Sequence, residues 1–595
     1  MSRNMTQDEF LIKNKKMQFR RLLKYFTPYL PMLVLSIVLA FVINAAVLAK
    51  PYIIKYVIDT YLVSGNHDAS RIRWLGLLYF GVVVLGAVMG YTQNYILNYI
   101  GQNIMHNIRK QLFTHIQHMS MAFFDKNSSG RILTRITNDV EALNELYSGV
   151  MVNIFRDAVM IIGIITMMFA MNVQLALISI GCVPLIALVT VFYRKAARKN
   201  FIKMKGMIAR INSFLAENIS GMKLVQIFHR EKEKYDELQE LDRDYFKFSL
   251  REIVLNSLGR PIVDIINNLT IAAVIWYCTG RVMSDALEIG VLYAFITYIK
   301  QFFDPIAEIS EKYTSIQSAV VSSERIFEIL DNVEPQEDME KGTRIEKLRG
   351  EIEFRNVWFA YDEEDWVLKD VSFTIHPGEM VAFVGATGSG KSTIISLIAR
   401  FYDIQKGEIL IDGVNIREYN LRDLRRQIAV VLQDVFLFSG DIKSNIRLKN
   451  KEISDEAVKY AAEFVNAHKF IETLHEKYDE EVKERGCTFS AGQKQLISFA
   501  RAVAFSPSIL VLDEATAYID TETEIAIQHA MTKISEGRTS VIIAHRLSTI
   551  RNADKIIVIH RGKIKEMGRH EELLEKNGLY HQLYTTQLAK ETVVA

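Results

Sequence analysis

The stretch Gly385-Ala386-Thr387-Gly388-Ser389-Gly390-Lys391-Ser392-Thr393 decides the fold of the C-terminal half of the chain. It matches the phosphate-binding pattern G-x-x-x-x-G-K-[ST] at every fixed position. The apolar run 379–384 before it predicts a buried strand, and residues 393–401 after it predict a helix, which is the context that such a loop requires. The sequence therefore predicts a nucleotide-binding loop. For the loop taken alone, the alternative is a glycine- and serine-rich turn that binds nothing.

The residue types in this loop suit phosphate chemistry. Glycines let backbone N–H groups turn toward phosphate oxygens, and the N-terminus of the following helix adds a partial positive charge. We expect Lys391 to bridge the β- and γ-phosphates and the hydroxyl of Ser392 to bind Mg²⁺. The loop residues that we predict to contact nucleotide are Gly385, Thr387, Gly388, Ser389, Gly390, Lys391, Ser392 and Thr393.

Length and composition limit the classes of protein that remain. The chain has 595 residues, which is too many for one ordinary domain, and its net charge of +2 gives no reason to expect a nucleic-acid partner. Its three cysteines, Cys182, Cys278 and Cys487, lie far apart and lack the spacing of a metal site or a disulfide framework. The first residues contain no apolar core before a small-residue cleavage site, so we expect no removable signal peptide.

Apolar segments in the first half predict membrane-spanning helices. Each is close to the ~20 residues that cross the hydrocarbon layer of a bilayer, so six spans within residues 1–330 are the simplest interpretation, and buried helices of a large soluble protein are the alternative. The runs are 28–49, 74–98, 149–171, 174–193, 257–279 and 289–310. Residues 194–210 are rich in Lys and Arg, whereas 171–173 carry no charge. The positive-inside rule then places both termini and the C-terminal domain in the cytoplasm.

Two long segments between these spans, 99–148 and 194–256, look helical and are too long for plain loops. We expect the spanning helices to continue beyond the bilayer and to turn near Phe123 and near Gly221. Apolar residues at these turns dock into a partner or pack on themselves, and the pattern leaves both alternatives open. Within the spans, charged residues such as Arg156 and Asp157 should face each other, water or headgroups, and Asp264 lies at a spacing suited to a translocation path.

After a polar linker at 331–345, residues 346–595 alternate between strand-like and helical segments. This order predicts an α/β domain with a mainly parallel, buried sheet. The strand-like runs are 351–361, 408–412, 428–432, 509–513, 540–544 and 555–560.

The order and spacing of further motifs resemble those of the ATP-binding cassette (ABC) family, and this resemblance extends along essentially the whole chain. Tyr361 stands where the family places an aromatic ring against adenine, and Gln433 follows the run 429–432. The run 509–512 ends in Asp513 and Glu514, and His545 follows 541–544. The chain resembles an ABC exporter half-transporter with an α-helical membrane domain fused to an α/β nucleotide-binding domain.

The resemblance also implies roles for these residues. Asp513, together with Ser392 and Gln433, is expected to hold Mg²⁺, and Glu514 is expected to polarise the attacking water. His545 is expected to sense the γ-phosphate. We therefore interpret Glu514, His545 and Gln433 as catalytic, with ATP and Mg²⁺ bound.

One motif departs from the family pattern. Phe489-Ser490-Ala491-Gly492-Gln493 stands where the family signature usually reads Leu-Ser-Gly-Gly-Gln, so that Ala491 replaces a glycine. The resemblance implies that Ser490, Gly492 and Gln493 contact the γ-phosphate bound by an opposite subunit, and a methyl group there is expected to weaken that closure. A competent Glu514 beside an altered signature is similar to one half of heterodimeric bacterial multidrug exporters. A heterodimer is the favoured expectation and a homodimer is the alternative.

These observations predict ATP-driven export of hydrophobic or amphipathic compounds across the bacterial cytoplasmic membrane. A lipid flippase or a peptide exporter of the same architecture is an alternative. A channel-like or regulatory ABC protein, in which nucleotide gates without pumping, is an alternative of another class, and an importer fits less well because importers usually carry spans and cassette on separate chains.

Overall fold

The computed structural model describes residues 20–63, 68–181, 183–283, 287–332, 341–362, 365–513, 521–544 and 550–594. These residues form two compact units. The first, called here the helical unit, contains the described residues up to Ile116 and from Gly130 to Asn332. The second, called the α/β unit, contains Gln117–Ser129 and the described residues from 341 onward. A short piece of the N-terminal half therefore groups with the C-terminal unit.

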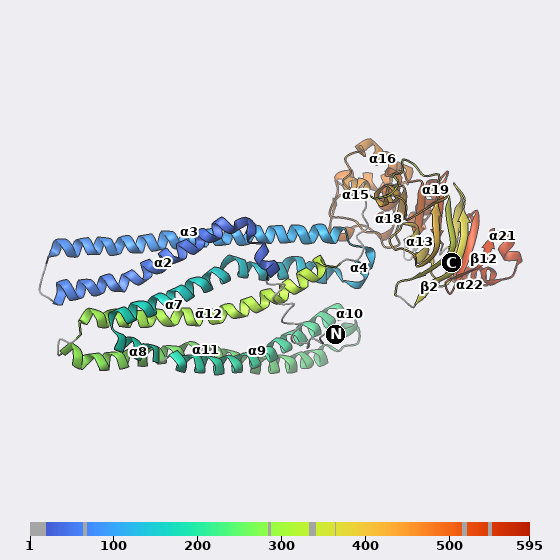
Figure 1. Cartoon of the computed structure of the whole chain (residues 1–595). Helices are drawn as coiled ribbons and strands as arrows, with labels where there is room; N and C mark the ends of the chain where they lie inside the picture. Colours follow the sequence, from blue (N-terminus) through green and yellow to red (C-terminus); the bar gives the residue numbers. More distant parts are fainter. Residues whose placement is uncertain are drawn as a thin grey trace, which may run out of the picture. The chain divides into compact units, whose positions relative to one another are not determined.

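Long helices make up the helical unit (Figure 1). They are α2 (Leu30–Val57), α3 (Ala69–Gln117), α7 (Met151–Met171), α8 (Val173–Gly181), α9 (Val183–Ser220), α11 (Glu231–Met283) and α12 (Ile289–Leu330). Shorter elements join them: η1 (Thr27–Tyr29), the π-helical turn η2 (Ile58–Val63), α5 (Ser129–Thr134), the π-helical turn η3 (Arg135–Asp139), α6 (Val140–Glu145), the π-helical turn η4 (Leu146–Val150) and α10 (Met222–Ile227). Within the described residues, every predicted apolar run falls mainly in one or two of the long helices; the run 28–49 begins in η1 and the run 149–171 begins in η4.

Three stretches among the described residues are long and apolar enough to cross a membrane: Thr27–Val63, Ala69–Gln117 and Ser129–Met171. The number six therefore stays a prediction. Around the window of α3 that could span, side chains such as Trp74 and Tyr91 are largely exposed, as expected for a helix that meets lipid. By contrast, α7, α11 and α12 share a core that contains Ile164, Val274 and Phe295, all fully buried.

Charged residues of the helical unit pair with one another, as the cost of an isolated charge in an apolar setting requires. The carboxylate of Asp157 in α7 is buried, and it lies 2.7 Å from Lys312 Nζ in α12 and 3.6 Å from Arg156 Nε. Asp264 in α11 is exposed instead, so its side chain lies outside the packed core of the helical unit. The position of a translocation path stays a prediction.

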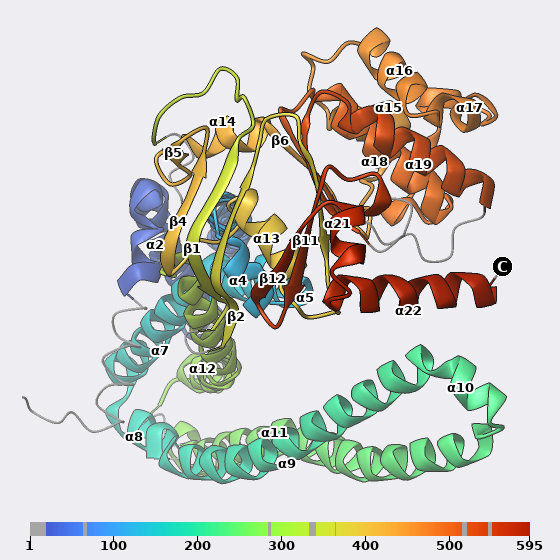
Figure 2. The same ribbon diagram turned by 90° about the vertical axis from the view of Figure 1, so that its right-hand side faces the viewer.

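Helices α9 and α11 lie side by side and meet at α10, which forms their shared tip (Figure 2). The chain turns at Gly221, between α9 and α10. Leu224, Ile227 and Phe228 at this tip are each more than 60% exposed. Because contiguous apolar surface on a monomer usually marks an interaction site, the tip has the character of a docking surface.

The α/β unit is built on two main sheets. Its six-stranded sheet has the order β12-β11-β3-β10-β9-β6, in which only β12 is antiparallel to its neighbour. Its four-stranded antiparallel sheet has the order β2-β1-β4-β5, and a two-stranded ribbon pairs β7 with β8. The strands are β1 (Ile352–Ala360), β2 (Trp366–Ile375), β3 (Met380–Val384), β4 (Lys406–Ile411), β5 (Val414–Asn415), β6 (Ile428–Val431), β7 (Gly440–Asp441), β8 (Glu481–Val482), β9 (Ile509–Asp513), β10 (Thr539–Ile543), β11 (Lys555–His560) and β12 (Lys563–Gly568).

This topology corrects one part of the sequence prediction. The runs 351–361 and 408–412 were assigned to the parallel sheet, but they form β1 and β4 of the antiparallel sheet. The reason is that β1 pairs along its length with β2, a strand that the sequence prediction did not include. The other four runs form β6, β9, β10 and β11, which are mutually parallel with β3 as predicted.

Helices cover the six-stranded sheet, and the sheet separates two hydrophobic cores, because alternate residues of its central strands belong to opposite cores. The helices are α13 (Lys391–Ile398), α14 (Leu421–Arg426), α15 (Ile442–Arg447), α16 (Asp455–Phe464), α17 (Ala467–Glu472), α18 (Ala491–Ala504), α19 (Thr521–Ser535), α21 (His570–Glu575) and α22 (Leu579–Val594), with 3₁₀ turns η5 (Lys477–Asp479) and η6 (Glu484–Gly486). One core packs α18 and its neighbours against the sheet, and the other lies between the two sheets around α13.

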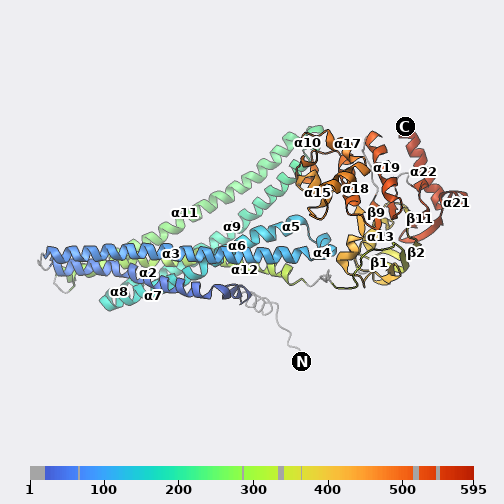
Figure 3. The ribbon, with the colours of Figure 1, turned by 90° about the horizontal axis from the view of Figure 1, so that it is seen from above.

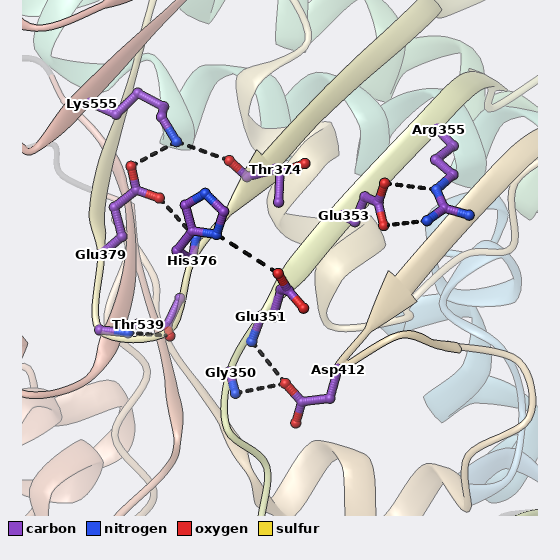
Figure 4. A network of polar contacts seen from close by, with 11 residues as sticks. Gly350, Glu351, Glu353, Arg355, Thr374, His376, Glu379, Asp412, Thr539 and Lys555 are labelled. Atoms are coloured by element: carbon purple, nitrogen blue, oxygen red, sulfur yellow. Dashed lines mark hydrogen bonds and ion pairs between the residues drawn. The ribbon is translucent and has the colours of Figure 1, made fainter.

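Polar contacts fasten the two sheets together at the N-terminal end of β3 (Figure 4). Lys555 at the start of β11 donates to the carbonyl oxygen of Thr374 in β2 at 3.0 Å and pairs with Glu379 at 2.7 Å. The same Glu379 carboxylate accepts from the backbone N–H of His376 at 2.8 Å. Since both members of the Lys555–Glu379 pair are largely buried, this contact holds the antiparallel sheet in place against the strand that leads to residues 385–393.

Candidate functional site

The predicted phosphate loop connects the C-terminal end of β3 to the N-terminus of α13, as its motif requires. Gly390 is the N-cap of α13 and has a φ of 107°, a conformation that only glycine adopts easily. A Cβ atom at this position would also lie 2.7 Å from Leu368 Cδ2. Both facts show why glycine stands at the second fixed position of the loop.

Lys391 is buried in the first turn of α13, and its Nζ donates to the carbonyl oxygens of Gly385 at 2.7 Å and Ala386 at 3.0 Å. Burial lowers the pKa of Lys391 from its usual value, and the nearby Asp513 carboxylate opposes that change. The ammonium group is thus held inside the loop by neutral carbonyls. A phosphate bound in this loop would place a negative charge directly beside the ammonium group of Lys391.

The hydroxyl of Ser389 supports the same conclusion. Ser389 is 4% exposed, and its Oγ has no hydrogen-bond partner in the described part of the chain. A buried hydroxyl without a partner is costly unless a ligand completes it. Of the other predicted loop residues, Thr387, Gly388 and Ser392 are exposed, whereas Thr393 is buried. The loop therefore offers backbone, hydroxyl and ammonium groups to an anion.

Strand register brings the other predicted site residues to the same edge. Asp513 ends β9 opposite Ile543 of β10, and Ile543 pairs in turn with Phe383 of β3. Gln433 follows β6, whose Val431 pairs with Leu512, and its side chain is exposed. Glu514 and His545 follow Asp513 and Ala544 in the sequence and lie outside the described residues. Parallel strands present their carboxyl ends at one edge, so Asp513 and Gln433 lie at the edge from which the phosphate loop begins.

The residues at this edge suit Mg²⁺ bound together with phosphates. Within the described ranges, no group of three His, Cys, Asp or Glu side chains could hold a metal ion by itself. Mg²⁺ usually keeps several waters and binds through one or two carboxylates plus substrate phosphates. One carboxylate, Asp513, with the hydroxyl of Ser392 and the amide of Gln433 nearby matches this donor set.

Tyr361, the predicted adenine-contacting residue, follows β1 directly. Its hydroxyl donates to Thr393 Oγ1 at 3.2 Å, and its ring meets the ring of Tyr402 edge-on at 5.1 Å. The hydroxyl of Tyr402 donates to the carboxylate of Asp125 in α4 (Met121–Lys126), and burial together with this bond raises the pKa of Tyr402. The expected turn near Phe123 therefore packs within the α/β unit, where Asp125 meets Tyr402 (Figure 3).

The signature segment begins α18. Ser490 is its N-cap: the Ser490 Oγ accepts from the Gln493 N–H at 3.2 Å, and the Gln493 side chain accepts from the Ser490 N–H at 3.0 Å. Ala491 is the first residue of the helix and is exposed, whereas Gly492 is buried. Alanine therefore leaves the cap intact. None of the described hydrogen bonds joins residues 489–493 to the phosphate loop.

Comparison with known proteins agrees with this geometry. The family model "ABC transporter transmembrane region" matches residues 33–306, and the model "ABC transporter" matches residues 368–517. The chain belongs to the ABC exporter family. A solved structure titled "Structure of a bacterial Atm1-family ABC exporter with ATP bound" is similar over 94% of this chain and 99% of that one, with a TM-score of 0.78 and 27% identity. This ABC exporter therefore binds and hydrolyses ATP and is a multi-pass membrane protein.

Relatives of this ABC exporter carry different substrate names. A probable multidrug resistance ABC transporter ATP-binding/permease protein, YheH of Bacillus subtilis, is 42% identical over 87% of this chain and 77% of its own length. An ATP-dependent lipid A-core flippase of Syntrophus aciditrophicus is 33% identical over 98% of this chain and 96% of its own length. Such half-transporters work as dimers on substrates in the membrane, and the names leave the substrate class of this ABC exporter open.

Two residues of this ABC exporter's site were missed by sequence reasoning. The sequence predicts a turn near Phe123, two residues before Asp125, and gives no role to Asp125 or Tyr402. Their only sequence signal is an aromatic residue just after the helix that follows the phosphate loop and an acid after two phenylalanines, Phe123 and Phe124. These signals are too short to reveal a contact between residues so far apart in the chain.

Proposed function

We propose that this ABC exporter moves hydrophobic or amphipathic compounds outward across the bacterial cytoplasmic membrane by alternating access. The observation that carries this proposal is the contact of Asp125 in α4 with Tyr402, next to Tyr361, within the α/β unit; on either side of α4 the chain leads into α3 and α5. A nucleotide at Tyr361 would thus lie near a segment whose chain leads directly into the helices of the helical unit. The name of the YheH relative supports the multidrug class, and the basic segment after the fourth apolar run supports cytoplasmic termini.

The proposed catalytic roles follow from the edge at which the site residues meet. Lys391 and the loop hydroxyls bind the phosphates, Tyr361 stacks on adenine, and Ser392, Gln433 and Asp513 hold Mg²⁺. Bound Mg²⁺ would supply charge neutralisation on the β- and γ-phosphates. Glu514 accepts a proton from the attacking water, His545 contacts the γ-phosphate, and the phosphate loop keeps the phosphates in line.

We propose that the working transporter is a heterodimer. The exposed cap at Ser490 and the exposed tip at Ile227 and Phe228 are both surfaces that a second chain would cover. In a heterodimer, the ATP bound at Lys391 meets the partner's signature, while Ala491 faces the partner's nucleotide. A homodimer places Ala491 at both sites.

Purification of this chain alone distinguishes the two assemblies. We expect weak ATPase activity without a second polypeptide, because each nucleotide would meet only the altered signature. Robust activity of the pure chain, further increased by an amphipathic compound, would establish the homodimer. Mass photometry of the same sample reports whether the active species contains one or two chains.

Transport against a gradient separates pumping from gating. In inside-out vesicles that contain the complete transporter, we expect ATP to drive accumulation of the amphipathic dye Hoechst 33342 above its equilibrium level, and the E514Q variant to show none. Dissipation of a preset gradient would indicate a nucleotide-gated channel. If dye does not accumulate but a fluorescent phosphatidylethanolamine moves between leaflets in an ATP-dependent way, the flippase alternative replaces the multidrug proposal.

A further inference from the structure

The C-terminal part of α12 is fastened to the π-helical turn η3 through Asp139. Asp139 is 5% exposed, yet its carboxylate is fully engaged. Its Oδ2 accepts from Arg135 at 2.7 Å within η3. Its Oδ1 accepts from the Ser322 hydroxyl of α12 at 3.0 Å and lies 3.6 Å from Arg325, one turn further along α12. We call Asp139, Arg135, Ser322 and Arg325 the Asp139 clamp.

The local backbone supports a special role for the clamp. Single π-helical turns inside α-helical segments are rare and occur frequently at functional sites. Here the π-helical turn η3 ends at Asp139, so the irregular backbone and the buried carboxylate occur at the same place. Packing alone does not need a charge at this position, because α6 and α12 contact each other and both already bury apolar side chains, Val140 and Leu143 in α6 and Ala319 and Ile326 in α12. The carboxylate adds a specific connection that apolar packing does not provide.

The N-terminal segment holds the same end of α12 from another direction. Arg21 makes a bidentate contact with Asp331, the residue after α12, and its guanidinium lies 4.1 Å from the centre of the Phe327 ring. The hydrogen bond with Asp331 raises the pKa of Arg21. The Tyr147 hydroxyl in η4 donates to the Leu22 carbonyl oxygen at 2.9 Å. The end of α12 is therefore fixed to both neighbouring segments by charged or hydrogen-bonded groups.

The position of the Asp139 clamp in the chain indicates its role. Helix α12 ends at Leu330, and the chain leaves the helical unit after Asn332. Along the chain, α4, which carries Asp125 and contacts Tyr402, is followed by α5 and η3. Two links thus lead from the helices toward the nucleotide loop. The first, called the covalent link, is the chain that follows α12, and the second is α4, which contacts Tyr402. Asp139 is the residue at which these two links meet through side chains, since η3 follows the docked segment and Ser322 and Arg325 precede the covalent link.

We propose that the Asp139 clamp joins the covalent link and the docked α4 into one mechanical unit, so that movement of the nucleotide domain reaches α12 and η3 together. Asp139 is thus a positioning residue for transport and takes no part in ATP chemistry. The inference rests on the proposed function, because it assigns the clamp to the coupling step of ATP-driven export. Its loss is expected to separate ATP hydrolysis from the movement of the membrane helices.

The test uses the complete transporter in lipid nanodiscs. Spin labels replace Trp74 in α3 and Trp276 in α11, both strongly exposed, after the native cysteines are removed. We expect ATP with vanadate to change the distance distribution between the labels in the wild type. In D139N, we expect ATPase activity within about threefold of the wild type and an unchanged KM for ATP, with the distance change lost. D139E should restore the change.

Two further variants keep the test decisive. E141Q makes the same chemical change two residues away at an exposed glutamate that pairs with Arg109 at 3.3 Å, and it should behave as the wild type. R325Q removes the exposed arm of the clamp and should lose part of the distance change even where D139N folds poorly. A full distance change in R325Q, or in a folded D139N, overturns the clamp. A wild type that hydrolyses no ATP or shows no change places the failure in the proposed function instead.

Discussion

Replacing Glu514 by glutamine is expected to reduce ATP turnover by about 100-fold or more while ATP still binds, because the amide keeps the shape of the side chain but cannot accept a proton from the attacking water. Glu514 is next in the sequence to Asp513, the last residue of β9, and the register of β9 with β10 and of β10 with β3 brings this strand end to the edge where the nucleotide loop begins. Steady-state phosphate release and binding of a fluorescent ATP analogue would measure the two properties separately.

The matched control is E452Q. Glu452 is an exposed glutamate of the same unit that pairs with Arg426 at 3.1 Å, so its amide should leave turnover unchanged. Because a partner chain in a heterodimer carries its own nucleotide, the assay is best made on the assembled transporter, where any residual rate is that of the second site. Normal turnover in E514Q would remove Glu514 from the mechanism.

The K391M variant is expected to bind ATP roughly 100-fold more weakly, because it removes the buried positive charge that attracts the phosphates. Methionine keeps most of the length and the apolar stem of lysine, so the helix start at Gly390 is preserved. In the wild type, burial lowers the pKa of Lys391 below its ordinary 10.5, and only the protonated form attracts phosphate. Affinity for ATP should therefore begin to fall at a lower alkaline pH than an ordinary lysine would give.

Equilibrium binding between pH 7 and pH 10 checks both parts of this prediction. K391M should be weak throughout and should lack the alkaline decline, whereas K469M, which changes an exposed lysine of the same unit, should follow the wild type. An unchanged affinity in K391M would mean that the phosphates are held by backbone groups alone. An alkaline decline that persists in K391M would assign the titration to another group.

Local chemistry explains which parts of the site were predictable. The phosphate loop, the acid after an apolar run and the serine before α18 depend on neighbours within a few residues, so their patterns are visible in the sequence. Pairing between strands is different, since the register of β1 with β2 and β4 depends on contacts that no local pattern reports. This is why two strands were assigned to the wrong sheet.

Long-range side-chain contacts were beyond prediction for the same reason. Asp139 and Ser322 are separated by 183 residues, and Asp125 and Tyr402 by 277. A carboxylate in a helical segment with mixed charges looks like an ordinary exposed residue until the fold shows what it meets. The sequence predicts only that charged residues in the spans face each other, water or headgroups; the structure shows that Asp157 meets Lys312 and Arg156, whereas Asp264 is exposed.

The N-cap of α18 leaves the Ser490 hydroxyl able to donate a hydrogen bond to an approaching group. A serine hydroxyl has one proton and two lone pairs, and the N–H of Gln493 occupies one of those lone pairs. The proton of Ser490 is thereby left to point away from the helix, which makes this oxygen a hydrogen-bond donor toward whatever approaches the exposed start of α18. An incoming group with only acceptor atoms, such as a phosphate, can accept this proton while the N–H of Gln493 keeps its own hydrogen bond to the same oxygen.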